Sequence, residues 1–257
     1  MSNTALKLLA LALMFIDHIA EFIPGTPIWF HWLGRLSAPI FLFSMAWGFK
    51  YTHDRKKYVL RMYLFGVLMS VMNFVLNNLY SGRAYIYIIN NIFVTLFLVA
   101  VIVWIIEIQR ENPKKGNKLA ACFILWQVLS TLLCLGASSL ISSMNTPIIG
   151  AVTANILTAE GGVPFVILGV LIYFAKENPR KLSWTYVIYT GMMFLLGIGP
   201  GVTLDWIFNV NYQWMMVFSL PFMLMYNGKK GRGLKYLFYI FYPVHIALLF
   251  LLGNCML

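Results

Sequence analysis

Apolar runs about as long as a lipid bilayer is thick recur along the whole of this 257-residue chain. Hydrophobic residues make up 61% of the sequence and charged residues only 11%, whereas a soluble domain carries about 25% charged residues. A soluble fold of this size has too little interior to hide so much apolar surface. The sequence therefore predicts an all-α, polytopic integral membrane helical bundle whose solvent is the lipid bilayer.

Nine of these runs predict transmembrane helices, because about twenty apolar residues cross the hydrocarbon core as a helix. They cover residues 4–23, 34–50, 58–79, 86–108, 118–140, 160–175, 183–199, 210–226 and 236–254. The sixth run is the shortest, and residues 143–159 predict a short helix at the outer surface. No internal repeat or linker divides the chain, so we expect a single domain over residues 1–257.

The basic residues predict how these helices are oriented. Clusters of Lys and Arg follow the second, fourth, sixth and eighth runs and hold nearly all of the 19 Lys and Arg residues. Because cytoplasmic loops are enriched in Lys and Arg, these clusters place the N-terminus inside and the C-terminus outside. Arg35 and Arg83 are left on the outer side, where Arg83 follows a Ser-Gly turn typical of a solvated loop.

The net charge of +11 does not indicate a nucleic-acid partner. The positive charges lie in short clusters between apolar runs, and the sequence has neither a basic arm nor a nucleic-acid-binding motif. Positive-inside loops account for the charge, so the partner that the composition predicts is the lipid bilayer itself.

Ionisable and polar side chains within membrane-spanning runs are costly, and they therefore mark candidate functional positions. Measured from the basic residues at the inner helix ends, His18 lies about 16 Å and His245 about 15 Å into the membrane, at 1.5 Å per residue. The hydrocarbon core is about 30 Å thick, so both histidines are predicted near its midplane. By the same measure Asn73 lies near the middle and Arg35 in the outer third.

Asp17, His18 and Glu21 share one face of the first helix, since residues three or four apart lie on the same side. A carboxylate beside an imidazole fixes its tautomer and raises its basicity, as a general base requires. This pattern favours His18 as a base. The alternative is that Asp17 or Glu21 only neutralises Arg35 and that His18 makes a structural hydrogen bond between helices.

The last helix contains Tyr242, Pro243 and His245 close together. Proline inside a helix leaves the carbonyl four residues earlier without its donor and kinks the helix. The sequence is consistent both with a cavity wall at His245 and with a histidine that only packs beside the kink. Other polar residues have simpler interpretations. Asn91 is expected to cap the fourth helix, and three residues are expected at the outer surface or interface: His31, Glu160 and Asp205.

No motif predicts a metal ion or a nucleotide-binding loop. The three cysteines, Cys122, Cys134 and Cys255, lie in apolar surroundings without the spacing of metal ligands, so we interpret them as packing residues. We therefore expect no metal.

Several segments together resemble the TraX family, in the expected order along the chain. The first-helix signature with its Asp-His pair is matched by Leu13 to Ile19, and a further family segment by Asn90 to Leu96. The second-helix motif and the loop after it are matched by Gly34 to Phe43, Gly48-Phe49, Tyr58 and Arg61. The last-helix signature is matched by Lys235 to His245. One departure is Ala20, where the family usually has a glycine.

The resemblance implies a membrane acyltransferase of the bacterial cytoplasmic membrane, related to the acyltransferase-three group. Such enzymes take an acyl group from cytoplasmic acyl-CoA, here acetyl-CoA or a longer donor. The founding TraX protein is associated with acetylation of the N-terminus of an F-type pilin. Carried over by residue, the family makes His18 the catalytic base, with Asp17 beside it and Arg35 as a further site residue.

The acceptor is left open between a peptide N-terminus, a sugar hydroxyl and a lipid headgroup. Arg35 would hold the developing oxyanion or bind an anionic acceptor. We expect the pocket for substrate or donor to include Glu21, Asn73, Asn91, Tyr242 and His245. The alternative functions are a secondary transporter or channel that uses the midplane His, Asp and Arg residues, and a non-enzymatic assembly or anchoring protein. A transporter often has internal repeats and paired broken helices, which this sequence lacks.

Overall fold

The computed structural model describes residues 1–81, 86–140, 146–198 and 202–256, and within these ranges the chain forms helices and no strand. The chain divides into two compact units. Unit 1 consists of Met1–Gly48 and Leu171–Leu257, and unit 2 of Phe49–Val170. Unit 1 therefore contains both ends of the chain. The single domain expected from the sequence stays a prediction.

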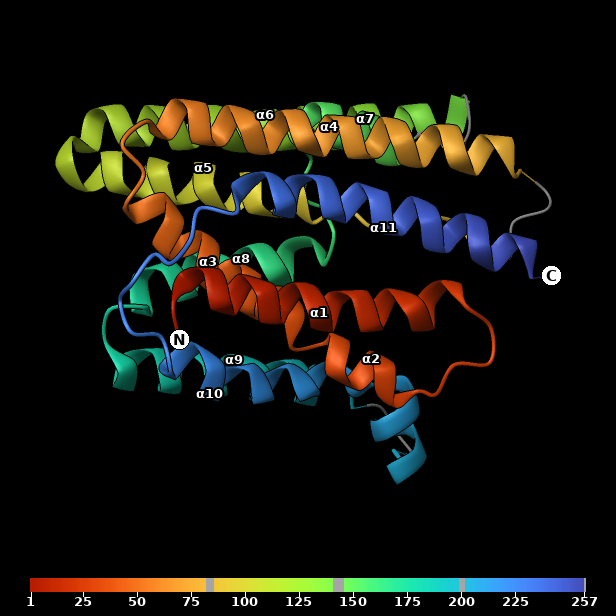
Figure 1. The fold of residues 1–257 in the computed structure, drawn as a ribbon. Coiled ribbons are helices and arrows are strands. Elements are labelled where there is room, and N and C mark those ends of the chain that lie inside the picture. The colour runs from red at the N-terminus through yellow and green to blue at the C-terminus, as the bar shows by residue number, and fades with distance from the viewer. Residues whose placement is uncertain (82–85, 141–145, 199–201, 257) are drawn as a thin grey trace. The chain divides into compact units, whose positions relative to one another are not determined.

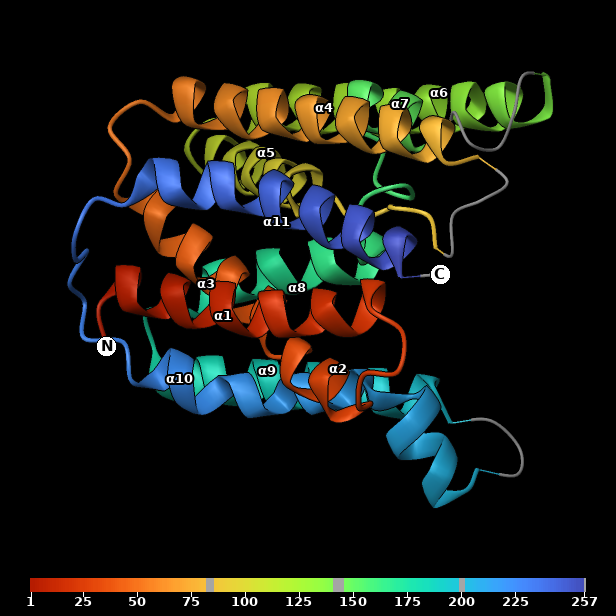
Figure 2. The same ribbon diagram turned by 45° about the vertical axis from the view of Figure 1, so that its right-hand side comes forward.

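Unit 1 is assembled around α1 (Asn3–Phe22). This helix contacts α2 (Trp29–Gly34) and α11 (Lys235–Cys255), and α2 contacts the 3₁₀ helix η3 (Tyr212–Ser219). The unit is completed by α9 (Pro179–Leu196), the π-helix η2 (Trp206–Val210) and α10 (Leu220–Leu224). Figures 1 and 2 both show α1 and α11 side by side and running in the same direction.

Contacts near both ends of α1 hold it to the last helix and to the loop before that helix. At the start, the backbone N–H groups of Asn3 and Thr4 donate to the carbonyls of Lys229 and Lys230, at 2.9 and 3.1 Å. At the other end, a Cβ on Gly253 would lie 2.0 Å from the carbonyl oxygen of Phe22. Only glycine allows so close an approach, so the end of α1 packs directly on the end of α11.

Unit 2 contains α4 (Arg55–Leu79), α5 (Ile92–Glu111), α6 (Pro113–Leu140) and α7 (Thr146–Thr153). The long helices α4 and α6 both pack against α5, and α7 also contacts both of them. The short helix predicted within residues 143–159 is confirmed as α7. Two helices, α3 (Ser37–Lys50) and α8 (Gly162–Ala175), begin in one unit and end in the other.

Side-chain caps explain where several helices begin. The Ser2 hydroxyl accepts from the Ala5 N–H at the start of α1. The Asp54 carboxylate accepts from the Lys57 N–H, 2.9 Å away, at the start of α4. This backbone hydrogen bond lowers the pKa of the Asp54 carboxyl. Asn178 caps α9 in the same way and is followed by Pro179 in the first turn, where proline costs no helical hydrogen bond.

Four helices are both long and apolar enough to cross a membrane, among the residues that the structure describes: Arg55–Leu79, Ile92–Glu111, Pro113–Ser139 and Tyr236–Cys255. This confirms an all-helical fold of membrane type within the described ranges. The nine crossings and the orientation of the two termini stay predictions. The first helix is 20 residues long, and its last six residues include Asp17, His18 and Glu21.

The predicted helix over residues 86–108 is wrong at its start, because α5 begins only at Ile92. Side chains of α4 explain why α5 begins later in the sequence than predicted. The Asn77 side chain accepts from the Ile88 N–H and donates to the Ile88 carbonyl, each at 2.9 Å. Asn73 donates to the Asn90 carbonyl at 2.9 Å. These hydrogen bonds satisfy the backbone of the segment before α5, which therefore has no need of helical pairing.

The predicted continuous helices over residues 34–50 and 210–226 are also interrupted. The first is divided, because α2 ends at Gly34 and α3 begins at Ser37. The second consists of η3 followed by the short helix α10. Pro221 lies in the first turn of α10, and its missing N–H prevents a continuous α-helix through this point.

Candidate functional site

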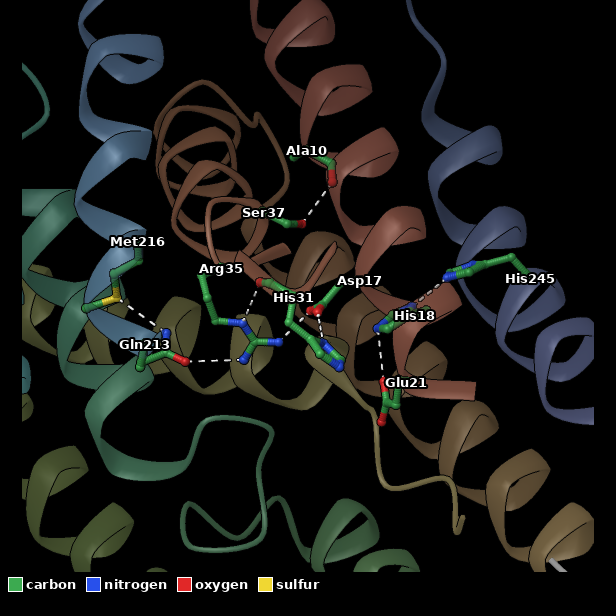
Figure 3. A network of polar contacts seen from close by, with 10 residues as sticks. All are labelled: Ala10, Asp17, His18, Glu21, His31, Arg35, Ser37, Gln213, Met216 and His245. Carbon is green, nitrogen blue, oxygen red and sulfur yellow. Dashed lines mark hydrogen bonds and ion pairs between the residues drawn. The ribbon is translucent and has the colours of Figure 1, made fainter. Parts of the chain in front are cut away.

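His18 of α1 and His245 of α11 form a buried pair in unit 1 (Figure 3). The Nδ1 atom of His18 lies 2.7 Å from Nε2 of His245. Each residue is only 4% exposed, and the two rings are nearly parallel, with centroids 5.0 Å apart. The two histidines that the sequence predicts at one depth, near opposite ends of the chain, therefore meet in space.

The backbone of α11 fixes the protonation pattern of this pair. The Nδ1 atom of His245 lies 2.6 Å from the carbonyl oxygen of Phe241, which can only accept a hydrogen bond. His245 must therefore donate from Nδ1, and in the neutral imidazole its Nε2 accepts. The hydrogen bond from His18 then comes from its own Nδ1. In a neutral His18 this leaves the lone pair on Nε2.

Glu21 lies on the proton-accepting side of His18. Its Oε2 atom is 3.9 Å from His18 Nε2, as the i,i+3 spacing predicts, and its side chain is 20% exposed. A carboxylate at this distance stabilises the imidazolium that forms when Nε2 takes up a proton. Tyr242 is buried beside both histidines, with ring centroids 6.1 Å from His18 and 5.8 Å from His245.

Asp17 binds different partners from the one expected. Its two carboxylate oxygens contact Nδ1 of His31 at 2.7 Å and Nη2 of Arg35 at 2.6 Å (Figure 3). The expectation that Asp17 orients His18 is thus not met, because His245 fills that role. The alternative, a carboxylate that neutralises Arg35, is confirmed for Asp17. The prediction of His31 as an interfacial residue missed its contact with Asp17.

Sequence reasoning also missed the residues of η3 that complete this network. Gln213 accepts from Nη1 of Arg35 at 3.3 Å. The ring of Tyr212 stacks on His31, with centroids 5.7 Å apart, and lies 5.5 Å from the Arg35 guanidinium carbon. No signal in the sequence indicates Tyr212 and Gln213, whereas the four-residue spacing of His31 and Arg35 is compatible with one helix face.

Gly34 allows α2 to reach Asp17. A Cβ built on Gly34 would lie 2.2 Å from Cγ of Asp17, which is far inside van der Waals contact. Any larger residue would displace the carboxylate from His31 and Arg35. The glycine that precedes Arg35 in the sequence is therefore part of the site, although it contributes no functional group.

Asn73 and Asn91 belong to unit 2, where both bind the backbone. The Asn91 side chain donates to the Gly66 carbonyl and to the Ser70 hydroxyl, each at 2.8 Å. The prediction that Asn91 caps its helix is wrong, because its side chain makes no hydrogen bond to the first turn of α5. Asn91 instead binds α4, which joins the start of α5 to the face that carries Gly66, Ser70 and Asn73.

Glu160 is partly exposed, and it also makes contacts that its expected place at the outer surface does not require. Its carboxylate accepts from the Asn91 N–H, and its carbonyl accepts from the Thr95 hydroxyl at 2.6 Å. Asp205, in contrast, is exposed as expected. The structure does not describe Arg83. Within the described ranges, no group of three or more His, Cys, Asp and Glu side chains is arranged to hold a metal ion.

The fold and the site define the class of the protein: it is a helical membrane protein with a pair of histidines and an Asp-His-Arg network. The family model described as TraX protein matches residues 2–253, so the chain belongs to the TraX family. The chain is also 27% identical over 256 residues to a probable fimbrial assembly protein FimC, serogroup H1, of Dichelobacter nodosus. That alignment covers 95% of this chain and 92% of the relative. No solved structure matches.

Proposed function

We propose that this protein is a membrane acyltransferase that moves an acetyl or other acyl group from cytoplasmic acyl-CoA to an amine or hydroxyl acceptor. One observation carries the proposal. The chain from the Phe241 carbonyl through His245 to His18 leaves a lone pair on His18 Nε2, as a general base needs.

In the proposed reaction, His18 Nε2 takes a proton from the acceptor as the acceptor attacks the thioester carbonyl. The new C–N or C–O bond forms, and the C–S bond breaks when the tetrahedral intermediate collapses. The proton held by His18 then passes to the leaving CoA thiolate, so that His18 ends the cycle neutral. Glu21, 3.9 Å from Nε2, stabilises the imidazolium between these two steps.

Arg35 has a positioning role in this proposal. Its three side-chain nitrogens contact Asp17, Gln213 and the carbonyl of His31, which itself is held by Asp17. A guanidinium committed to protein partners in this way fixes the Asp17 carboxylate more directly than it serves a passing oxyanion. The role of oxyanion donor expected from the sequence is therefore secondary to positioning.

We place the protein in the bacterial cytoplasmic membrane with nine crossings and the N-terminus inside. The alternating basic clusters of the sequence support this topology. Acyl-CoA would then approach from the basic inner side, and the acceptor from the outer side. The relative from Dichelobacter nodosus is described as a fimbrial assembly protein, which favours the terminal amine of a pilus subunit as the acceptor.

The test uses purified protein in detergent with labelled acetyl-CoA. Wild-type protein should release CoA thiol and transfer label to an added amine. His18→Ala should lose about 10²–10⁴-fold of both rates, the range for removal of a general base. Its thermal unfolding should stay close to that of the wild type. Absence of thiol release from folded wild-type protein would contradict acyl transfer and favour the transport alternative.

A further inference from the structure

His31 presents a second oriented imidazole, outside the His18–His245 pair. The Asp17 carboxylate can only accept, so the 2.7 Å contact requires a proton on Nδ1 of His31. In the neutral ring the lone pair is then on Nε2. Among the residues that the structure describes, Nε2 of His31 has no hydrogen-bond partner. The His31 side chain is 21% exposed, compared with 5% for His18.

The groups around His31 come from three elements. From α1, Asp17 binds it, and His18 interacts with it electrostatically. Directly after α2, Arg35 shares the same carboxylate. From η3, Tyr212 stacks on the ring, and Gln213 binds Arg35. The Arg35–Asp17 ion pair joins the end of α2 to α1, and the lone pair on Nε2 of His31 takes no part in that contact.

We infer that His31 is a second acid–base residue of the proposed transfer, one that deprotonates a protonated amine acceptor. This role rests on the proposed acyl transfer and applies to primary amine acceptors that arrive as ammonium ions. An N-terminal amine has a pKa of about 8, so at neutral pH it is mostly charged and cannot attack a thioester. An accessible imidazole beside a carboxylate can remove the excess proton before the amine reaches the buried pair.

The proton balance of amine acylation requires two acceptors. The ammonium ion gives its first proton to His31 Nε2 and becomes a neutral amine. The amine then forms the C–N bond to the thioester carbon and gives its second proton to His18 Nε2. As the C–S bond breaks, His18 returns that proton to the CoA thiolate. His31 releases the first proton to water through its exposed side, and one proton is liberated in each cycle.

The variant that separates this role from a structural one is His31→Asn. The Asn amide nitrogen can take the place of Nδ1 and keep the hydrogen bond to Asp17, while the proton-accepting Nε2 is lost. Two acceptors are compared with acetyl-CoA at pH 7: a peptide with a free N-terminal glycine, which is mostly protonated, and hydroxylamine, which is mostly neutral. Leu33→Ala, at an exposed position on α2, is the matched control.

We expect His31→Asn to slow transfer to the peptide by about 10²-fold or more, with little change for hydroxylamine. The defect should shrink at pH 9, where the peptide amine is mostly neutral. An equal loss with both acceptors, or no loss with either, would overturn the role of His31. If wild-type protein acetylates neither acceptor, the proposed acyl transfer fails instead. Transfer to hydroxylamine by the variant shows in the same sample that the protein is folded.

Discussion

Two groups of polar side chains, one in each unit, bind different kinds of partner. In unit 2, the side chains of Asn73, Asn77 and Asn91 donate to the backbone carbonyls of Asn90, Ile88 and Gly66. In unit 1, Asp17 binds His31 and Arg35, and His18 binds His245. Both sets would be flagged alike by a rule that polar residues in membrane-spanning runs are functional.

Polar residues inside such a protein can therefore be sorted by the kind of group with which they form hydrogen bonds. An amide that binds a carbonyl replaces a missing helical hydrogen bond, as in the irregular segment before α5, and this is a structural task. A chain of titratable side chains can change its protonation state. Each of the two networks in unit 1 contains an imidazole whose lone pair is directed by its partners, His18 in one and His31 in the other. Acid–base chemistry is therefore possible in unit 1, whereas these asparagines of unit 2 cannot take up a proton.

Among the substitutions that test this difference between the units, those at His245 should have the largest effect. His245→Leu should lower the rate of acyl transfer by about 10–100-fold, the cost known for residues that orient metal-binding histidines through the same kind of hydrogen bond. His245→Gln should retain much of the activity, because its amide oxygen can accept from His18 Nδ1 as the imidazole does. The rates are compared for equal amounts of folded protein. Equal losses in the two variants would contradict an orienting role.

A smaller effect, of a different kind, is expected at Asn91. Asn91→Ala removes the hydrogen bonds to the Gly66 carbonyl and the Ser70 hydroxyl. Hydrogen bonds between membrane helices contribute about 0.6 kcal/mol on average, so the free energy of unfolding should fall by roughly 1–2 kcal/mol. Unfolding by detergent titration measures this change. The acyl-transfer rate per folded molecule should stay the same, and a selective loss of that rate would place Asn91 in the site.

Much of the fold could be predicted from the sequence, because hydropathy and helix rise depend on local residues. Helices occur in all nine predicted runs, and helix rise placed His18 and His245 at one depth. Their contact could not be predicted, since it joins residues 227 positions apart. The partner of Asp17 was missed because the chain turns back after α1, and this brings His31 to a carboxylate that local spacing had assigned to His18.

The other residues whose contacts were not predicted have equally specific explanations. Asn91 precedes an apolar run and so has the pattern of a helix cap, but the Gly66 carbonyl and the Ser70 hydroxyl compete for its side chain. The residues of η3 gave no signal, because Tyr212 and Gln213 look like ordinary positions in an apolar run. Their contact with α2 depends on tertiary packing that a single sequence does not reveal.

The most direct test of the account is a double-mutant cycle on His18 and His245, with the rate of label transfer from acetyl-CoA to hydroxylamine as the measurement. If His245 acts by orienting His18, His245→Leu should slow the wild-type protein by about 10–100-fold. The same change should have almost no effect on protein that already carries His18→Ala. Losses that multiply in the double variant would contradict the account, because they would mean that the two histidines act independently.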